Sequence, residues 1–478
     1  MAFEGLRKKG IRLSLDAEEF ISKNGVSEEE IIALEKHFVN IEDVQGIVSR
    51  RKEEEKKHSA EVSGPSSSRP LASEYEPELK VREDSDVTGK SRTEGGVEDF
   101  VSYFRNRYEA LSTLLKTYSG KYPEADLEGI SKLAGQKARI VVMVTEFRET
   151  KKGNLLLQVE DLTGQFKVVV SRRDEKAFEK AMNLVKDDVI LIYGKIAPAF
   201  MIAEDLEWPD VRVGREKKEA ERDLAAVYLS DLHFGSKEFL GEYFNRFTDW
   251  INLRGSGQEL AGKVKYVFVA GDLVDGIGIY PNQEKDLEEP DVFKQYALFA
   301  DFVEDLPDYI KVVVSPGNHD AVRRAEPMPA LSKEILGCDV VSVGSPSMFC
   351  AENQEHLIYH GTSADSWISS LPNLSYDHPE KVMVECLRRR HLSPSFGGNA
   401  IVPEKTDYMV IKREPDIVHF GHVHKNGYSN YRGSLIINSG TFQDTTDFQK
   451  KQGHIPTPAK VPIYEFMGKK LRTLDFTR

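Results

Sequence analysis

The sequence predicts an α/β sandwich over residues 223–478, preceded by a small five-stranded β barrel over 99–222 and by a helical unit over 1–50. Three observations support this. Apolar, largely β-branched runs alternate with helical stretches in the C-terminal half, short apolar runs separated by turns occur between residues 137 and 206, and residues 27–38 place apolar side chains at helical spacing. A chain of 478 residues is also long enough for two or three separate cores.

The composition is typical of a globular protein, with 40% hydrophobic and 30% charged residues. No apolar stretch reaches the roughly 18 residues that a membrane span needs, and no long apolar run follows the basic residues of Met1–Gly10. We therefore expect a cytoplasmic protein without a membrane anchor. Cys338, Cys350 and Cys386 lack CxxC spacing, which favours reduced thiols over a disulfide framework.

The formal net charge of −13 argues against a protein that coats nucleic acid by bulk electrostatics, because neutralising phosphates requires clustered Lys and Arg. An enzyme acting on nucleic acid remains compatible with this charge, since metal sites concentrate carboxylates. A local basic groove is also compatible. Arg388, Arg389 and Arg390 form one such cluster, which either follows a DNA backbone or belongs to a solvated helix face.

The N-terminal helical unit is predicted from a capping box. Ser27 is the expected N-cap and Glu30 closes the box, while Ile31, Leu34 and Phe38 share one helical face. Such a module is usually an interaction domain. Residues 51–98 that follow are rich in Ser, Pro, Gly and charged side chains, which predicts a flexible linker.

The barrel is predicted from the order of its elements. A helix that begins near Phe100 introduces it. The expected elements are strands at 137–147, 155–159 and 166–170, a helix at 174–184, and strands at 189–193 and 200–206. Three strands, a helix and two strands is the order of an OB-fold. Nine charged residues among the thirteen from Val211 to Asp223 indicate a domain junction.

An OB-fold can bind single strands by stacking bases on aromatic side chains above a basic groove. The candidates for this role are Phe147, Phe166, Lys167, Arg172 and Arg173. Because the aromatic residues are few, we favour the alternative that the barrel is a packing and docking module.

The sandwich is predicted from strands at 225–229, 264–270, 310–314, 356–359, 416–420 and 435–437, with a helical segment at 292–303. Five polar clusters follow these apolar runs, and each is therefore expected where a buried strand gives way to a loop. They are Asp231-Leu232-His233, Gly271-Asp272-Leu273-Val274-Asp275, Gly317-Asn318-His319-Asp320, Tyr359-His360-Gly361 and Gly421-His422-Val423-His424.

The clusters contain the donors that a pair of divalent cations requires. Hydrolysis of a phosphodiester by two metals needs a bridging carboxylate, several neutral nitrogen or oxygen donors and an open position for hydroxide. Asp272 follows Gly271, where glycine lets the backbone turn sharply and bring the carboxylate between two ions. Asn318 supplies a neutral oxygen that limits repulsion of the substrate phosphate. Each motif alone is a weak signal, but all five in order are specific.

The pattern DxH, GDxxD, GNHD, H and GHxH resembles the calcineurin-like metallophosphoesterases from Leu224 to Phe476. Within that superfamily, residues 271–282, 315–320, 360–363 and 438–441 resemble the small subunit of archaeal D-family DNA polymerase, whose domain layout the chain also matches. The resemblance implies a 3′→5′ exonuclease that proofreads for a separate large polymerase subunit, in a heterodimer or larger assembly, and acts on DNA 3′ ends. It also makes a sliding clamp a candidate partner.

The resemblance assigns the site residues. One metal would be held by Asp231, His233, Asp272 and His424, and the other by Asp272, Asn318, His360 and His422. His319 would protonate the leaving oxygen or steady the phosphate, and Asp275 would orient His319 and raise its pKa. Mixed imidazole and carboxylate donors suit Mn, Fe or Zn, and we expect Mn.

Three further residues are predicted near the site. His419 alternates out of phase with His422 and His424, which favours a supporting contact to a ligand over simple burial. Asp365 and Trp367 follow the His360 cluster and are candidates for the border of the substrate groove, although nothing in the spacing requires it.

Two other functions compete with the nuclease. A protein phosphatase of the same superfamily would carry an Arg after GDxVD to grip a monoester, whereas Gly276 follows Asp275 here. A catalytically silent scaffold that bridges the large subunit and DNA is the other alternative, since related eukaryotic subunits have lost their ligands. This chain keeps all seven, and a scaffold has no physical reason to retain such mutually repelling groups.

Overall fold

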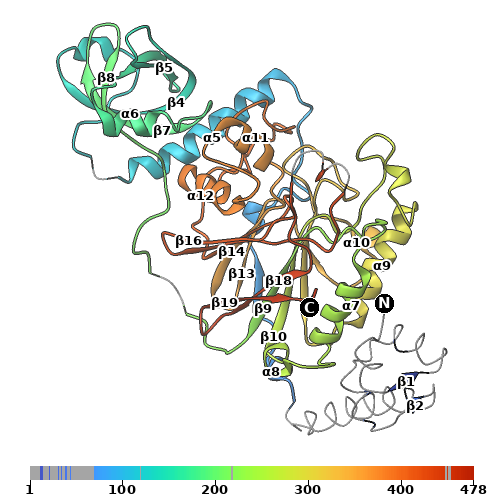
Figure 1. The fold of residues 1–478 in the computed structure, drawn as a ribbon. Coiled ribbons are helices and arrows are strands. Elements are labelled where there is room, and N and C mark those ends of the chain that lie inside the picture. Colours follow the sequence, from blue (N-terminus) through green and yellow to red (C-terminus); the bar gives the residue numbers. More distant parts are fainter. Residues whose placement is uncertain are drawn as a thin grey trace. The chain divides into compact units, whose positions relative to one another are not determined.

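A computed structural model of the chain describes residues 69–478 apart from 119, 217–218, 447–448 and 451–453, together with isolated positions before residue 45 (Figure 1). The chain divides into two compact units, Met1–Arg69 and Pro70–Arg478. In the first unit, β1 (Arg12–Leu13) pairs in parallel with β2 (Phe38–Val39). Phe38 thus lies in a strand, so its predicted place on a helix face is wrong. The predicted capping residues Ser27 and Glu30 lie outside the described residues.

The C-terminal part of the second unit is built on two six-stranded sheets, as the predicted α/β sandwich requires. The first sheet has the order β12-β11-β10-β9-β18-β19, with β9 (Ala225–Leu229), β10 (Val264–Ala270), β11 (Lys311–Ser315), β12 (Val341–Ser342), β18 (Lys460–Glu465) and β19 (Lys470–Asp475). The second has the order β16-β17-β15-β14-β13-β3, with β3 (Leu79–Val81), β13 (Ser347–Ala351), β14 (Gln354–Ile358), β15 (Ile417–Phe420), β16 (Gly427–Tyr431) and β17 (Ser434–Asn438).

Three apolar layers hold the sandwich together. Tyr228, Phe268, Phe349 and Ile437 belong to the core between the sheets. A second core packs the first sheet against the helices α7 (Gly241–Ile251) and α9 (Val292–Asp305), near α8 (Gln258–Ala261) and α10 (Lys333–Leu336). A third packs the second sheet against α11 (Ala364–Ser370) and α12 (Pro379–Arg389), which lie across the sandwich from α7 and α9 in Figure 1.

The central strands β9, β10 and β11 of the first sheet were predicted nearly to the residue, because they are mostly apolar runs that are buried on both faces. The strands β3, β12, β13, β16, β18 and β19 were not predicted. They are short or partly polar, so their sequences carry little periodic signal.

The predicted flexible linker at 51–98 is wrong from residue 70 onward. Its second half contains the 3₁₀ turns η1 (Leu71–Glu74) and η2 (Glu83–Ser85), and β3 pairs antiparallel with β13. The Asp86 carboxylate accepts a hydrogen bond from the backbone N–H of Gly344 (2.7 Å). The segment is polar, yet main-chain pairing fixes it to the sandwich, and a composition rule cannot detect such pairing.

The five-stranded closed barrel is confirmed. It has the order β4-β5-β6-β8-β7, with β6 and β8 parallel. Its elements are β4 (Lys137–Glu149), β5 (Leu155–Glu160), β6 (Gln165–Val170), α6 (Glu175–Ala181), β7 (Val189–Ile196) and β8 (Met201–Glu207). The helix α5 (Val97–Lys116) packs against β4 and β7 through Leu111 and Leu115, and the 3₁₀ turn η3 (Ile130–Leu133) covers the barrel core.

Two further findings concern the cysteines and the helices. The three cysteines, all among the described residues, form no disulfide bond. Among the described residues, no helix combines the length and apolarity needed to cross a bilayer.

Buried neutral histidines make the fold sensitive to acid. His356 lies between the rings of Phe349 and Tyr228, and burial lowers its pKa to about 3. Below about pH 6.5 this histidine binds a proton in the unfolded chain but stays neutral in the folded chain. Its contribution to the free energy of unfolding is therefore fully present above that pH and falls as the pH drops. Between pH 7 and pH 5 we expect His356 to cost about 2 kcal/mol of unfolding free energy.

Urea unfolding at the two pH values measures this loss. His356→Gln keeps a hydrogen-bonding group for Tyr228 and should reduce the difference between pH 7 and pH 5. His378→Gln, at an exposed histidine, is the matched control and should leave the difference unchanged. Equal pH dependence in all three proteins would contradict the prediction.

Candidate metal centre

The five polar clusters lie at the C-terminal ends of five strands from both sheets. Asp231 follows β9, Asp272 follows β10, Asn318 follows β11, His360 follows β14, and His422 follows β15. Within each sheet these strands are parallel to one another, so their loops meet at one edge of the sandwich. The predicted placement of the clusters is what brings their side chains together.

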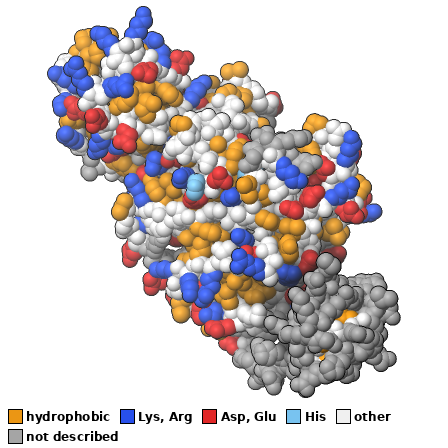
Figure 2. Space-filling model, viewed as in Figure 1, with side chains coloured by type: hydrophobic (Ala, Val, Ile, Leu, Met, Phe, Trp, Pro, Cys, Tyr) orange, Lys and Arg blue, Asp and Glu red, His pale blue; other side chains and the backbone are white. Residues whose placement is uncertain are grey.

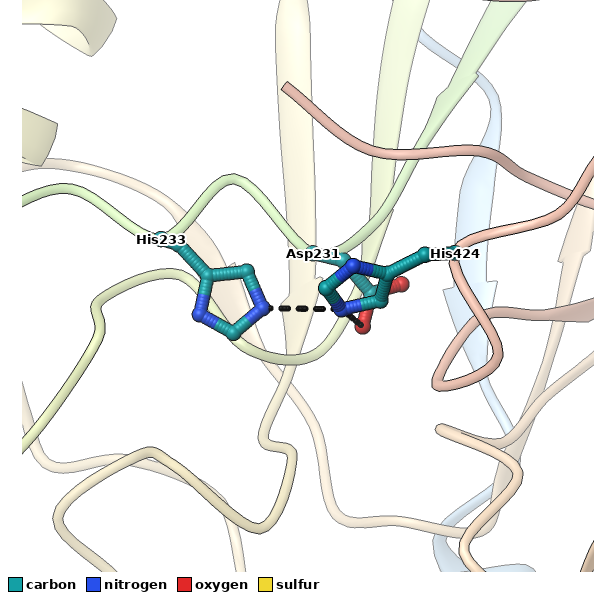
Figure 3. A group of neighbouring side chains, drawn as sticks. All are labelled: Asp231, His233 and His424. Carbon is teal, nitrogen blue, oxygen red and sulfur yellow. Dashed lines mark hydrogen bonds and ion pairs between the residues drawn. The ribbon is translucent and has the colours of Figure 1, made fainter. Parts of the chain in front are cut away.

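The first group consists of Asp231, His233 and His424, whose side chains converge in Figure 3. The Nε2 atoms of His233 and His424 are 3.0 Å apart, and Nε2 of His424 is 3.4 Å from Oδ1 of Asp231. All three side chains are buried. Two imidazole nitrogens bound to one tetrahedral cation lie about 3.4 Å apart, because each is about 2.1 Å from the ion. The group therefore has the dimensions of a cation site.

The second group is formed around Asp272 and His360. Nε2 of His360 is 3.2 Å from Oδ2 of Asp272 and 3.0 Å from Oδ1 of Asn318. The same Asp272 oxygen is 3.9 Å from Nε2 of His233 in the first group. One carboxylate oxygen of Asp272 thus faces both groups, as a bridging ligand would. Its other oxygen accepts the backbone N–H of His319 (2.8 Å).

Hydrogen bonds fix which nitrogen each histidine presents. The Nδ1–H of His233 donates to Oδ1 of Asp275 (2.9 Å), and the Nδ1–H of His360 donates to the carbonyl of Ala270 (2.8 Å). Both bonds leave Nε2 free to face the cluster. The side-chain amide of Gln449 is hydrogen-bonded to Nδ1 of His424 (2.8 Å). The Nε2 atom of His424 therefore faces the cluster as well.

His422 is held differently from the other ligands. Its ring lies edge to face with His360 at 5.2 Å between centroids, but its Nε2 is hydrogen-bonded to Oδ2 of Asp365 (3.1 Å). Asp365 also accepts a hydrogen bond from the hydroxyl of Tyr376 (2.7 Å). Because Nε2 is engaged, Nδ1 is the nitrogen of His422 that remains for a cation.

Trp367, which was predicted with Asp365 at the border of the substrate groove, is buried. Its ring N–H donates to the carbonyl of Leu392, so it does not border a groove.

Asp365 should therefore support cation binding through His422. We expect Asp365→Ala to weaken binding of the second Mn²⁺ about 10- to 100-fold, as for other outer partners of ligand histidines. Asp365→Asn keeps an oxygen that accepts from Nε2–H and should lose less. Calorimetric titration of Mn²⁺ measures both variants, and unchanged affinity in Asp365→Ala would contradict this role.

Backbone strain marks the same residues. Asp231, His233, Asp272, His422 and His424 all have φ between 52° and 69°, a left-handed conformation that costs non-glycine residues energy. The two neighbouring glycines are sterically required. A Cβ on Gly271 would lie 2.5 Å from Nδ1 of His360, and one on Gly317 would lie 2.2 Å from Oδ1 of Asp272. Strain concentrated on predicted ligands is typical of a functional site.

The predicted role of Asp275 is wrong in detail. Its carboxylate holds His233, with Oδ1 4.0 Å from Nδ1 of His319, and the backbone carbonyl of Asp275 accepts the His319 Nδ1–H instead (2.7 Å). Burial lowers the pKa of His319, against the predicted rise. The carbonyl still fixes the tautomer, so Nε2 of His319 remains available beside the cluster.

His419 does not support a ligand. It is buried, and its Nε2 is hydrogen-bonded to Oγ of Ser439 (2.5 Å) while its ring packs edge to face on Tyr228. The alternation that placed it out of phase with His422 instead turns its side chain toward the core between the two sheets, where Tyr228 lies.

The structure also corrects the basic cluster. The guanidinium of Arg389 is 2% exposed, ion-paired with Glu385 and with Asp188 of the barrel (2.9 Å). Arg390 is 3% exposed and donates to the carbonyls of Ile411 and Lys412. Only Arg388 is partly exposed, and it pairs with Glu385. The cluster joins the barrel to the sandwich, so the predicted DNA contact of Arg389 and Arg390 is wrong.

Sequence reasoning gave no role to three supporting residues, which are Asp320, Gln443 and Gln449. Asp320 accepts the backbone N–H groups of Leu273 and Gly317 and so joins two of the loops. Gln443 donates to Oδ1 of Asp275 (3.1 Å). Only Asp320 had a sequence signal, since it completes the GNHD motif. Gln443 and Gln449 lie between β17 and β18, outside the five motifs.

The charges of the buried side chains favour bound cations. Burial raises the pKa of Asp272, but His360 and the other imidazoles outweigh it and hold that pKa well below its usual range. Burial likewise lowers the pKa of His360, but the Asp272 carboxylate outweighs it and raises the pKa to about 10. A buried, ionised carboxylate is stable only beside positive charge. That charge comes either from protons on the neighbouring imidazoles or from bound cations. Together with the converging donors, this fits two divalent metal ions.

Comparisons with known proteins agree with the site. The family model described as calcineurin-like phosphoesterase matches residues 226–426, which contain all seven predicted ligands. The chain is 43% identical to the DNA polymerase II small subunit of Archaeoglobus fulgidus, over 81% of this chain and 79% of that protein. It is 38% identical to that of Methanocaldococcus jannaschii (85% and 70% covered) and 39% identical to that of Methanothermobacter thermautotrophicus (79% and 80% covered).

Proposed function

The chain belongs to the family of DNA polymerase II small subunits and carries a calcineurin-like phosphoesterase domain, and on that premise we propose that it is a metal-dependent 3′→5′ exonuclease. It would remove nucleotides from DNA 3′ ends for a separate large polymerase subunit. The observation that carries the proposal is the position of Asp272, whose Oδ2 faces both His360 and His233. A bridging carboxylate between two sets of donors is the arrangement that two-metal phosphodiester hydrolysis needs.

The first ion would be held by Asp231, His233, Asp272 and His424, and the second by Asp272, Asn318, His360 and His422. When bound, the two ions would supply Lewis-acid activation of the phosphate and of the attacking water. The donor set suits Mn²⁺ as well as Fe or Zn, and we propose Mn²⁺.

His319 would act on the phosphate side of the site. Its ring lies 4.7 Å from that of His233, and Nδ1 is held by the Asp275 carbonyl, which leaves Nε2 for the substrate. Burial lowers the pKa of His319, but an arriving phosphate anion would raise it again and favour the imidazolium. The imidazolium can steady the phosphate and protonate the leaving 3′-oxygen.

A scaffold remains the alternative function, because a polymerase subunit can bridge its partner and DNA without hydrolysis. Backbone strain and buried charge argue against the scaffold. Five ligand residues adopt left-handed backbone conformations, and buried carboxylates lie close together where apolar side chains would stabilise the fold better. The phosphatase alternative is weak. A Cβ on Gly276 would lie 2.2 Å from the carbonyl oxygen of His319, so the position cannot hold the Arg that grips a monoester without displacing this loop.

The test is release of mononucleotides from an oligonucleotide labelled at its 5′ end, with the pure chain and with the large subunit added. We expect stepwise shortening from the 3′ end that requires Mn²⁺ and stops with EDTA. Full-length DNA after incubation with Mn²⁺ and the large subunit would favour the scaffold. Shortening from the 5′ end would contradict the polarity.

His319→Ala separates chemistry from metal binding. We expect the single-turnover rate to fall about 10²- to 10⁴-fold, the usual contribution of a general acid. Bound Mn²⁺ should remain nearly unchanged, because the side chain of His319 is not among the proposed ligands. His378→Ala, at an exposed histidine, is the control. Equal loss of metal and rate would instead make His319 a ligand.

A further inference from the structure

A buried glutamine contacts both the backbone and the side chain of Asp275. Gln283 begins the 3₁₀ turn η4 (Gln283–Lys285) and is 1% exposed. Its Nε2 donates to the backbone carbonyl of Asp275 (2.8 Å) and to Oδ2 of the same residue (3.0 Å). Its Oε1 accepts the backbone N–H of Ile279 (2.9 Å). Both amide hydrogens and the amide oxygen of Gln283 are therefore used inside the protein.

These three partners allow only one orientation of the Gln283 amide. If its oxygen and nitrogen were exchanged, the oxygen would face the carbonyl and the carboxylate of Asp275, and the NH₂ group would face the N–H of Ile279. All three contacts would then be repulsive, and a buried polar group without a partner costs about 1–3 kcal/mol. Gln283 therefore presents its two donors to Asp275.

The two acceptor groups of Asp275 serve different histidines. Oδ1 of its carboxylate accepts from Nδ1–H of His233 (2.9 Å) and from Nε2 of Gln443 (3.1 Å), while Oδ2 accepts from Gln283. Nδ1 of His319 is 4.0 Å from Oδ1, which is too far for a hydrogen bond, and donates to the Asp275 carbonyl instead (2.7 Å). Gln283 thus donates to the carboxylate that holds His233 and to the carbonyl that holds His319.

The loop between Asp275 and Gln283 gains little stability from apolar burial. Ile277 is 50% exposed and Tyr280 is 38% exposed. Figure 2 shows hydrophobic, acidic and basic side chains together on the surface around the position that α9 has in Figure 1, and α9 follows this loop. A second buried amide holds the loop one residue beyond Asp275, since Oε1 of Gln295 accepts the backbone N–H of Gly276 (2.8 Å). Buried amides therefore fix this exposed loop.

We propose that Gln283 is a positioning residue that assigns the two acceptor groups of Asp275 to two different histidines. It keeps the carboxylate for His233 and the carbonyl for His319, which explains why the expected pair of Asp275 carboxylate and His319 is not formed. What the two histidines do rests on the proposed function, in which His233 holds the first cation and His319 acts on the phosphate.

The loss of the Gln283 amide has a definite structural consequence. Oδ2 of Asp275 would lose its partner, and rotation of the carboxylate would bring an oxygen within hydrogen-bond reach of Nδ1 of His319, from which Oδ1 is now 4.0 Å away. The same rotation would release Nδ1–H of His233. Gln283 therefore affects both histidines through Asp275, although its own amide contacts neither of them.

The test uses Gln283→Met in the full chain, because methionine keeps the length of the side chain and removes its hydrogen bonds. Nuclear magnetic resonance of protein labelled with ¹⁵N in the histidine rings shows which ring nitrogens carry hydrogen. Spectra are recorded in EDTA, so neither metal binding nor hydrolysis affects them. We expect the Nδ1–H signal of His233 to be lost through exchange with water. The Nδ1–H signal of His319 should move downfield as it gains a carboxylate partner.

Two controls separate this role from general loosening of the loop. His360 donates its Nδ1–H to the carbonyl of Ala270 and should keep its signal in the same spectrum. Gln295→Met removes the buried amide that holds Gly276 and should leave the signals of His233 and His319 in place. Gln283→Glu faces Asp275 with acceptors instead of donors and should repeat the changes of Gln283→Met. It replaces that variant if the methionine protein does not fold.

A titration with Mn²⁺ provides the second measurement. The first ion should bind about 10- to 100-fold more weakly to Gln283→Met, as expected when the partner of a ligand histidine is lost. Unchanged signals of His233 and His319 would overturn the proposal, and so would equal changes in Gln295→Met, because the loop and not the contact with Asp275 would then hold the histidines. If the signals change as expected but the wild-type chain hydrolyses no DNA, the nuclease proposal fails and the role of Gln283 stands.

Discussion

Asp272→Asn is expected to abolish hydrolysis, lowering the single-turnover rate about a thousandfold or more. The substitution keeps the shape of the side chain but removes the charge of the one oxygen that faces both His360 and His233. An amide oxygen is a weak bridging ligand for two cations, so bound Mn²⁺ should fall from two ions to one or none. Metal analysis after gel filtration and a quench assay on single-stranded DNA measure the two effects.

Asp301→Asn is the matched control, because Asp301 is exposed on α9 away from the cluster. It should retain both ions and the full rate. Thermal unfolding of both variants shows whether they are folded. If Asp272→Asn kept two ions and its rate, the bridging role would be wrong, and the nuclease proposal would lose the observation that carries it.

The candidate site was largely predictable because its signals are local. Each ligand stands directly after a buried strand, and the C-terminal ends of parallel strands meet at one edge, so order along the chain becomes proximity in space. Glycine positions were equally readable, since Gly271 and Gly317 allow contacts that a Cβ would block.

What could not be predicted depends on partners distant in the sequence. The Asp275 carboxylate turns to His233, 42 residues away, and leaves only its backbone carbonyl to His319. Arg389 pairs with Asp188, 201 residues away, so a run of three arginines that reads as a basic surface is a buried junction. Asp365 supports His422 from a helix without any motif. Periodicity and motifs describe residues that are close in sequence, whereas each of these contacts joins residues that are far apart in sequence.

The fold shows the same division. Central strands carry continuous apolar runs, whereas β3 depends on pairing with β13, about 270 residues later, for its main-chain hydrogen bonds. The side chains of β3 are half-buried or exposed, so its sequence has no apolar run that would indicate a strand. The polar composition of the segment therefore predicted a linker. Short edge strands of this kind are defined by the sheet they join and not by their own side chains.

Arg107→Ala is expected to destabilise the fold by about 3–5 kcal/mol, because it leaves Asp407 buried and unpaired. The two side chains are 0% exposed, and Nε of Arg107 is 2.7 Å from Oδ2 of Asp407. The same oxygen is 2.9 Å from Nε2 of His391, and a further guanidinium nitrogen of Arg107 donates to the hydroxyl of Tyr103 (2.9 Å). This network joins α5 to the sandwich, so its loss should uncouple the helix and lower the unfolding midpoint in urea.

The pH dependence distinguishes the ion pair from simple packing. Burial raises the pKa of Asp407, but His391 and Arg107 outweigh it and hold that pKa well below its usual value. The ion pair therefore contributes fully to the free energy of unfolding above about pH 3.9, the pKa of an aspartate in the unfolded chain. This contribution is lost only in stronger acid. The difference between wild type and Arg107→Ala should accordingly remain at both pH 7 and pH 5. Arg107→Met/Asp407→Leu, which buries no charge, should recover most of the loss.

Arg105→Ala is the matched control for this experiment, since Arg105 lies two residues earlier on α5 and is exposed. It should change the unfolding free energy by less than about 0.5 kcal/mol. A cost for Arg107→Ala no larger than that of Arg105→Ala would mean that water reaches Asp407 when the guanidinium is removed. The junction between α5 and the sandwich would then depend on the apolar contacts of the helix and not on its buried charges.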